Sequence, residues 1–400
     1  MPKCRIGILI TLTSGQNMRF LQIFSSALGA DPRPSKFFAL LRSLGQVDVC
    51  ACPPVATFGP VEHFTSLPQR PKALQHKITR AAGLIARRYE ADIWFPAMRT
   101  LLNQFSGKQY AAIVCHDALL LPFALAVSAT RADKAKRCPV IMDAREFYPR
   151  QFEHQPLWRF VLHGINDYVC RRYLPQADLV FTVSPGLVEG YRKDYGVSCE
   201  LLPSYADFQD ITPYATDAGG LRCIHHGAAM PGRHIENMLE AFALLQGRAQ
   251  LDLMLVPSNV RYLEKLKRMA VGIPNVNFVD PVPMKDIVAH IARYDVGVYL
   301  LHADSFNHRH ALPNKLFEFI QARLAVAVSP VPDMAGLVCE QQVGVVAADF
   351  SPQAFAACIG ALAPADVDRY KANANKAAHV FCWEQNDVFI REKLFALMDN

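Results

Sequence analysis

The chain has 400 residues, of which 51% are hydrophobic and 20% charged, and its formal net charge at pH 7 is +6. This length exceeds one typical hydrophobic core, so two domains are expected, and no apolar run is long enough for a membrane-spanning protein. The eleven cysteines are scattered without a CxxC pair, which excludes zinc ribbons and thioredoxin-type sites and suits a reducing cytoplasm.

The first half of the chain alternates apolar segments with amphipathic ones. Residues 5–12 are interpreted as a first buried strand rather than a signal peptide, Gly15 lies in the loop after it, and residues 18–28 are predicted to form a helix. Further strands are predicted at 47–51, 111–115, 139–142 and 179–183, and further helices at 119–128 and 186–195. Strands that alternate with helices predict a parallel, doubly wound sheet.

Residues 70–88 are strongly basic. They contain six cations and no acidic residue. Leu74, Ile78, Ala81 and Ile85 share one helical face with these cations around it, which is typical of a helix that lies on an anionic membrane surface. A solvated helix face is the plainer interpretation, and both stay open. No nucleic-acid partner is expected, because aromatic interleaving and known binding motifs are absent.

A polar segment without periodicity, residues 204–220, is predicted to link two domains. A second alternating series follows it, with strands predicted to begin at 221 and at 251–256, 276–279 and 296–301. The series ends near residue 345, and the last stretch of the chain includes a predicted helix. We therefore expect domains at 1–204 and 205–372, followed by a C-terminal segment, 373–400.

Residues 311–330 (ALPNKLFEFIQARLAVAVSP) carry the clearest functional signal. Pro313 suits the first turn of a helix, and the apolar residues after it recur at helical spacing until a β-prone run begins. This helix start follows the buried strand 294–301, so it lies at the carboxyl end of a parallel strand, where open α/β sheets bind ligands. Unpaired N–H groups there favour a diphosphate, and Glu318 is placed to accept hydrogen bonds from a sugar diol.

The segment YDVGVYLL…LPNKLFEFIQARLAVAVSPVPDM resembles the donor-binding segment of nucleotide-sugar-dependent glycosyltransferases of the two-Rossmann-domain (GT-B) type, family four in particular. Three further segments share this resemblance: residues 110–152, ADLVFTVSPGLVEGYRKDYGV, and IHHGAAMPGRHIENMLEAFALL. The resemblance implies an α/β fold of two Rossmann-like, doubly wound parallel-sheet domains that face each other across a cleft. The N-terminal domain would bind the acceptor and the C-terminal domain the donor, with the terminal helix crossing back to the first domain.

The resemblance also implies roles for individual residues. Arg233 stands in the place of the family's phosphate-binding arginine, and His116 matches the first-domain histidine that faces the donor sugar. Asp117 would position the sugar or the acceptor, and Lys315 would add a point charge beside the helix start. The predicted catalytic residues are His116, Asp117, Arg233 and Glu318. The predicted nucleotide-sugar-binding residues are Gly15, Arg233, His310, Asn314, Lys315, Leu316 and Glu318.

Two positions depart from the family pattern. His310 replaces the first of the family's paired glutamates, and only the second, Glu318, is kept. Arg145 replaces a histidine on the predicted acceptor side, between Asp143 and Glu146. We expect these changes to alter sugar or acceptor preference, towards a carboxylate-bearing sugar or a phosphate-bearing acceptor.

The resulting functional hypothesis is a retaining, metal-independent hexosyltransferase. It would move a sugar from a nucleoside-diphosphate sugar to a glycan or lipid-linked acceptor in bacterial polysaccharide, lipopolysaccharide or capsule assembly, without a prosthetic group. It would be cytoplasmic and peripheral on the inner face of the membrane, through residues 70–88. The alternatives are a nucleotide-sugar epimerase and a weakened sugar-nucleotide-binding partner subunit. A metal site on the loop of His302, Asp304, His308 and His310 is not expected, because flexible loops hold metals poorly.

Overall fold

The computed structural model describes residues 18–26, 31–53, 63–130, 138–217 and 219–399, so the predicted strand at 5–12 and Gly15 lie outside the described residues. The first domain is built on a parallel sheet with the strand order β3-β2-β1-β4-β5-β6-β7. Its strands are β1 (Arg19–Ile23), β2 (Gln46–Ala51), β3 (His63–Ser66), β4 (Ala112–Cys115), β5 (Val140–Ala144), β6 (Leu179–Thr182) and β7 (Glu200–Leu201). The middle strands are buried on both faces, as parallel sheets between helices are.

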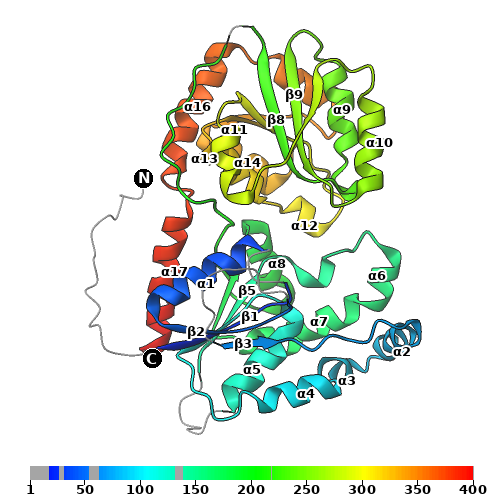
Figure 1. Ribbon diagram of the computed structural model, residues 1–400, viewed down its shortest axis with the longest axis vertical. Helices are drawn as coiled ribbons and strands as arrows, with labels where there is room; N and C mark the ends of the chain where they lie inside the picture. The colour runs from blue at the N-terminus through cyan, green and yellow to red at the C-terminus, as the bar shows by residue number, and fades with distance from the viewer. Residues whose placement is uncertain (1–17, 27–30, 54–62, 131–137, 218, 400) are drawn as a thin grey trace.

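Helices cover both faces of this sheet (Figure 1). One face packs against α1 and the C-terminal helix, and the other packs against α4, α5, α7 and α8. The helices of the first domain are α1 (Pro32–Leu44), α2 (Leu74–Ile85), α3 (Tyr89–Ile93), α4 (Pro96–Asn103), α5 (Leu121–Ala129), α6 (Pro156–Val161), α7 (His163–Arg172) and α8 (Pro185–Tyr195).

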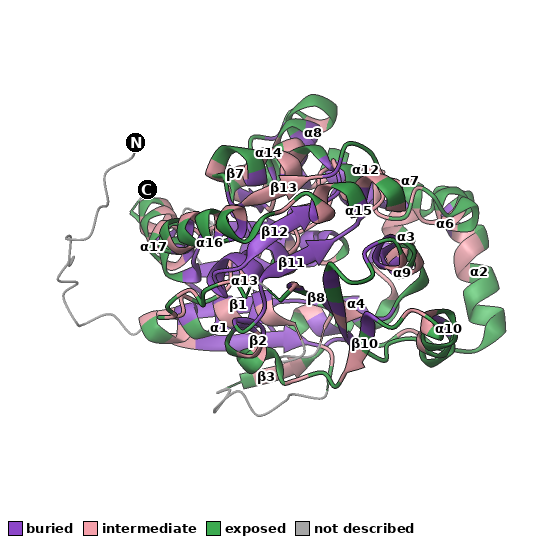
Figure 2. Ribbon diagram, turned by 90° about the horizontal axis from the view of Figure 1, so that it is seen from above, coloured by how far each residue is buried: buried purple, intermediate pink, exposed green. Residues whose placement is uncertain are grey.

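The second domain contains a parallel sheet in the order β10-β9-β8-β11-β12-β13. Its strands are β8 (Leu221–Ala228), β9 (Ala249–Val256), β10 (Val276–Val279), β11 (Val296–Tyr299), β12 (Ala325–Val328) and β13 (Gly344–Val346). The helices are α9 (Ile235–Ala243), α10 (Val260–Ala270), α11 (Ile287–Ile291), α12 (Phe306–Arg309), α13 (Asn314–Gln321), α14 (Pro332–Gln341), α15 (Pro352–Gly360) and α16 (Pro364–Ala378). Figure 2 shows the sheets as the buried interior beneath exposed outer helices.

The last helix, α17 (Trp383–Met398), lies against the first domain, whereas α16 lies against the second (Figure 1). Trp383, Ile390 and Leu394 of α17 are buried among side chains of β1 and α1. The extended segment between β7 and β8 follows the same side of the molecule. Its carbonyl groups accept hydrogen bonds from Asn386 and Lys371, so α16, α17 and this segment join the two domains.

The prediction of a helix at residues 18–28 is wrong, because Arg19–Ile23 is the strand β1, which lies inside the sheet between β2 and β4. Its apolar residues alternate between the two faces of the sheet: Phe20 joins the core beneath α1 and α17, while Leu21 and Ile23 join the core on the opposite face. A strand buried on both faces has a continuous apolar run, and a run this short does not distinguish a strand from a buried helix.

Within the described residues, no helix combines the length and the apolar character that a membrane crossing requires.

Candidate active site

Arg233 lies just beyond the carboxyl end of β8, in the short 3₁₀ turn Pro231–Arg233. Its Nη1 donates a hydrogen bond to the hydroxyl of Tyr299, which ends the neighbouring strand β11 (2.7 Å). The left-handed backbone of His234 (φ 48°) then turns the chain into α9. The guanidinium is therefore positioned by two adjacent strands of the second-domain sheet, at the end where open α/β sheets bind their ligands.

Lys315 brings a second cation to the same place, from the first turn of α13. Its Nζ lies 4.0 Å from the centre of the Tyr299 ring and 3.5 Å from Nε2 of His225. Gly227 makes room for it, since a Cβ there would lie 3.3 Å from Nζ. Burial lowers the pKa of Lys315 well below its usual value, and Arg233 lowers it further. A bound polyanion would reverse this effect and hold the ammonium in its charged form.

Glu318 lies one turn further along α13. Its Oε2 is 3.4 Å from Nε2 of His226. Burial raises the pKa of Glu318 to about 7, and Lys315 and Lys36 of the first domain oppose this rise. Burial, together with Lys315, lowers the pKa of His226 to about 3, so that this imidazole is neutral near pH 7. The contact between them is therefore not an ion pair, and both side chains keep hydrogen-bonding capacity for a ligand hydroxyl.

The other two predicted donor-side residues of α13 differ in exposure. Asn314 is exposed at the first position of the helix, whereas Leu316 is buried in the domain core. Leu316 can therefore contact a ligand only through its backbone. The N–H groups of a first helical turn lack intrahelical acceptors and carry partial positive charge. The start of α13 thus adds to the positive charge of Arg233 and Lys315.

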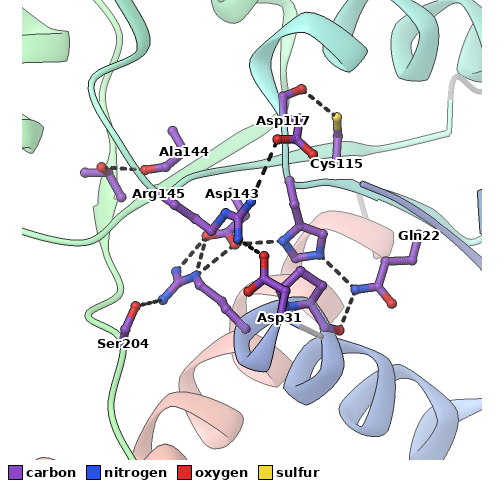
Figure 3. Close-up of polar contacts among 12 residues, drawn as sticks. Gln22, Asp31, Cys115, Asp117, Asp143, Ala144, Arg145 and Ser204 are labelled. Atoms are coloured by element: carbon purple, nitrogen blue, oxygen red, sulfur yellow. Dashed lines mark hydrogen bonds and ion pairs between the residues drawn. The ribbon is translucent and has the colours of Figure 1, made fainter. Parts of the chain in front are cut away.

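His116, predicted to face the donor sugar, is instead fully buried in the first domain. Its Nδ1 lies 2.8 Å from Oδ2 of Asp143, and its Nε2 lies 2.8 Å from the amide nitrogen of Gln22. Both ring nitrogens are occupied, so direct contact with a sugar does not fit this geometry. Figure 3 shows Gln22 and Asp143 on opposite sides of this ring, at the ends of the central strands.

Asp143, predicted on the acceptor side, is equally buried. Arg33 of α1 donates to both of its carboxylate oxygens, from Nε (2.8 Å to Oδ2) and from Nη2 (2.6 Å to Oδ1). Burial alone would raise its pKa, but Arg33 and His116 outweigh burial and hold the pKa well below its usual value. Asp143 is therefore an ionised structural group that fixes His116 and Arg33, and its side chain is not exposed at the surface.

Three half-buried charged side chains lie just beyond the ends of β4 and β5: Asp117, Arg145 and Glu146. Arg145 forms ion pairs with Asp31 and, at 3.7 Å, with Asp117, as Figure 3 shows. Asp117 also accepts a hydrogen bond from the backbone N–H of Ser25 (2.6 Å). The Arg145 guanidinium is thus paired with two carboxylates beside the loop after β1.

Glu146 connects the two domains electrostatically. Burial raises its pKa, while Gln151, Arg145 and the second-domain Arg233 lower it. In the same way, Lys36 of the first domain lowers the pKa of Glu318 in the second domain. Charged groups of both domains therefore lie close enough to influence each other: Glu146 and Lys36 on the first domain, and Arg233 and Glu318 on the second.

His310, predicted to bind the donor, lies at a contact between the domains. Its Nδ1 is 3.4 Å from Oδ2 of Asp333, and the same oxygen accepts a hydrogen bond from the N–H of Gly186 in α8 (2.9 Å). A Cβ on Gly186 would lie only 1.7 Å from His310 Nδ1. His310 thus fills the space that Gly186 leaves open, and it contacts the first domain.

The segment before His310, which includes α12, forms further contacts with the first domain. Asn307 accepts a hydrogen bond from the N–H of Phe147 (2.7 Å), and the N–H of Phe306 donates to Glu153 (2.6 Å). In the same segment, His302 bonds Asn237 and the exposed Asp304 bonds His234. In the part of the chain that the structure describes, no three His, Cys, Asp or Glu side chains are arranged to hold a metal ion.

Sequence reasoning missed Tyr299, His226, Arg33 and Lys36. The sequence pattern identifies Tyr299 only as part of an apolar strand. A tyrosine hydroxyl at the end of a buried strand nevertheless indicates that a polar partner lies nearby. The pair His225–His226 at the end of β8 offered a similar signal. Arg33 and Lys36 lie in a segment without a recognisable motif, and only the folded arrangement shows their partners.

Two parallel α/β domains, with charged residues gathered at strand ends from both, define the two-Rossmann-domain (GT-B) architecture of glycosyltransferases. Residues 221–364 match the family model described as glycosyl transferases group 1. The second domain is therefore similar to glycosyl transferases group 1 domains, in agreement with the resemblance seen in the sequence. No curated protein matches the chain by sequence.

Solved structures share this fold. Anabaena Alr3699/HepE in complex with UDP is similar with a TM-score of 0.69 and 14% identity, over 95% of this chain and 100% of that chain. The complex of the same protein with UDP-glucose gives 0.66 and 15%, over 96% and 99%. The UDP-forming α,α-trehalose-phosphate synthase from Burkholderia vietnamiensis gives 0.67 and 12%, over 95% and 100%. At this identity the likeness shows the fold alone.

Proposed function

We propose that the protein is a retaining, metal-independent glycosyltransferase that moves a hexose-type sugar from a nucleoside-diphosphate sugar to an acceptor. The observation that carries this proposal is the convergence of Arg233, Lys315 and the start of α13 on one point beside Tyr299. Glu318 lies one turn further along the same helix. The diphosphate would bind to the cations and the helix start, and the nucleoside diol to Glu318.

The chemistry follows from the charge that develops when the diphosphate leaves. The bond between the anomeric carbon and the diphosphate oxygen breaks, so negative charge grows on the leaving group while the sugar becomes oxocarbenium-like. Arg233 offers a bidentate guanidinium fork, and Lys315 and the α13 start add positive charge nearby. Fixed charges of this kind stabilise such a leaving group without a metal ion.

The acceptor would bind from the side of the first domain. Glu146 is the half-buried carboxylate there that lies close enough to the second-domain Arg233 to be influenced by it, and burial raises its pKa. Asp117 lies beside Glu146. A carboxylate with a raised pKa suits transfer of the acceptor hydroxyl proton near neutral pH. His116 and Asp143 would act as positioning residues, since they hold the β4 and β5 ends that carry these two acids.

The proposed acceptor is a glycan or lipid-linked glycan in bacterial polysaccharide, lipopolysaccharide or capsule assembly, at the cytoplasmic face of the membrane. The exposed basic helix α2, on the acceptor side, supports this setting. His310, where the family has a glutamate, contacts Asp333 and Gly186. We propose that it controls the approach of the two domains rather than the choice of donor sugar.

Release of nucleoside diphosphate is the direct test of this function. The full chain is incubated with a panel of UDP-, GDP- and ADP-sugars, with and without glycan or lipid-linked acceptors. Acceptor-dependent release of the diphosphate, with a new glycosidic bond of the donor's anomeric configuration, is expected. Conversion of the donor sugar without an acceptor would instead identify an epimerase, and binding without turnover would identify a partner subunit.

Replacing Glu318 with glutamine is expected to weaken nucleoside-diphosphate binding while it stabilises the fold. Loss of charge-assisted hydrogen bonds to a diol costs roughly 10- to 100-fold in affinity. The pKa of Glu318 is about 7 in the folded protein and 4.5 ordinarily. The ionised side chain therefore destabilises the native state, and this destabilisation grows as the pH rises from 4.5 to above 7. The gain in unfolding free energy is therefore up to about 3 kcal/mol at pH 8 and vanishes near pH 4.

Titration calorimetry and denaturant unfolding of this variant at pH 4 and pH 8 check both effects. Glu340→Gln, the same change at an exposed glutamate on α14 of the same domain, is the control. If E318Q bound the nucleotide as tightly as the wild type, the assignment of Glu318 to the diol would be wrong.

A further inference from the structure

The apolar face of α2 is open to solvent. Leu74 is 72% exposed, Ile78 is 60% exposed and Ile85 is 48% exposed, whereas Leu84 alone is buried and anchors the helix to the domain. A surface helix of a globular protein normally turns its apolar stripe towards the core. The helix α2 therefore presents an apolar stripe that nothing in the described chain covers.

The neighbouring helix α6 extends this apolar surface. It packs against α2, and the two helices lie next to each other at one edge of the molecule in Figures 1 and 2. Leu157 is 76% exposed and Phe160 is 69% exposed. Trp158, between them in sequence, is half-buried against Phe152. Large apolar side chains thus protrude from two adjacent helices, which together we term the α2–α6 surface.

Positive charges accompany the α2–α6 surface. Its exposed cations are Lys72, Lys77, Arg87, Arg88 and Arg159. Among the described residues, none of these five forms an ion pair, in contrast to Arg70 and Arg80, which both pair with Asp92. No acidic residue occurs between 70 and 88. The surface therefore combines protruding apolar groups with uncompensated positive charge.

We propose that the α2–α6 surface docks on a bilayer that contains anionic phospholipids. The leucine, isoleucine and phenylalanine side chains enter the boundary between headgroups and acyl chains, and the cations contact the lipid phosphates. The half-buried Trp158 suits the same depth, since tryptophan is enriched at membrane–water interfaces. The charge complementarity favours this occupant over a second copy of the chain, whose identical surface would bring like charges together.

Docking there would place the acceptor side of the active site near lipid. The chain passes from Glu146 to the start of α6 at Pro156 within ten residues. A lipid-linked acceptor would then reach the site from the membrane that α6 contacts. The docking itself does not depend on the proposed reaction, because it requires only the two helices of the folded first domain.

Co-sedimentation of the full chain with vesicles tests the proposal. Binding is expected to vesicles of equal parts phosphatidylglycerol and phosphatidylcholine, to weaken at 0.5 M salt, and to be much weaker with phosphatidylcholine alone. Each cation near an anionic surface contributes about fivefold in affinity, so Lys77→Gln with Arg88→Gln is expected to weaken binding about 25-fold. Ile78→Ser with Phe160→Ser, which removes two inserting side chains, should weaken binding at least tenfold.

Matched controls come from the second domain. Arg261→Gln with Arg268→Gln removes two exposed cations from α10, and Val271→Ser removes an exposed apolar side chain; both variants should bind vesicles like the wild type. Wild-type binding by the α2–α6 variants, or equal binding to both kinds of vesicle, would overturn the proposal. So would a wild-type dimer that these variants convert to a monomer, because the surface would then bind a second copy.

Discussion

Replacing Arg233 with alanine is expected to lower the turnover of a nucleoside-diphosphate sugar about 150-fold, or roughly 3 kcal/mol of transition-state stabilisation. The guanidinium is fixed by the Tyr299 hydroxyl and lies with Lys315 around the same ring. It would stabilise the diphosphate most strongly once that group has gained its full negative charge. The loss should therefore appear mainly in kcat, measured as diphosphate release under saturating donor.

The conservative variant separates charge from geometry. Arg233→Lys keeps the positive charge but loses the bidentate fork, so intermediate activity is expected. Arg261→Ala on the exposed face of α10 serves as the matched control and should leave turnover unchanged. Turnover of R233A within a few-fold of the wild type would show that the leaving group is stabilised elsewhere.

Replacing Asp143 with asparagine is expected to reduce the unfolding free energy by about 3–5 kcal/mol at pH 7. The carboxylate is fully buried between Arg33 and His116, and an amide leaves the guanidinium charge uncompensated. The pKa of Asp143 is lowered in the folded protein, so its stabilising effect is present above its ordinary value of 3.8 and is lost as the pH falls below it. Urea unfolding of both proteins at pH 7 measures the difference.

Two comparisons identify the cause of this loss. Asp387→Asn breaks the half-buried pair with Arg391, one turn along α17, which should cost only about 0.3–0.5 kcal/mol. The double variant Arg33→Met with Asp143→Leu removes both buried charges and should recover much of the stability. If D143N cost no more than D387N, the buried ion pair would not be the structural group that its geometry indicates.

Much of the second domain was predictable from local sequence pattern. The strand at 276–279 begins and ends as expected, and helix α13 starts directly after Pro313. Continuous apolar runs bounded by turn residues identify buried parallel strands, and a proline at a helix start fixes the boundary. The same spacing places Lys315 and Glu318 within the first two turns of one helix, whereas the role expected for Lys315 came from the family resemblance.

The first domain shows what local pattern cannot supply. Residues 19–23 contain apolar spacing that suits either a helix or a strand, and only pairing with β2 and β4 on both sides decides for the strand. The burial of His116 and Asp143 depends on Arg33, which is 110 residues from Asp143 in the chain. The position of His310 depends on the missing side chain of Gly186 in the other domain. Such long-range partners leave no trace in a single sequence.

The central claim is that a diphosphate group binds between Arg233, Lys315 and the start of α13. A crystal structure of the protein with uridine diphosphate tests it most directly. The predicted result places phosphate oxygens within hydrogen-bonding distance of the Arg233 guanidinium and the Lys315 ammonium, with the ribose hydroxyls at Glu318. A diphosphate bound elsewhere, with Arg233 still bonded only to Tyr299, would contradict the claim.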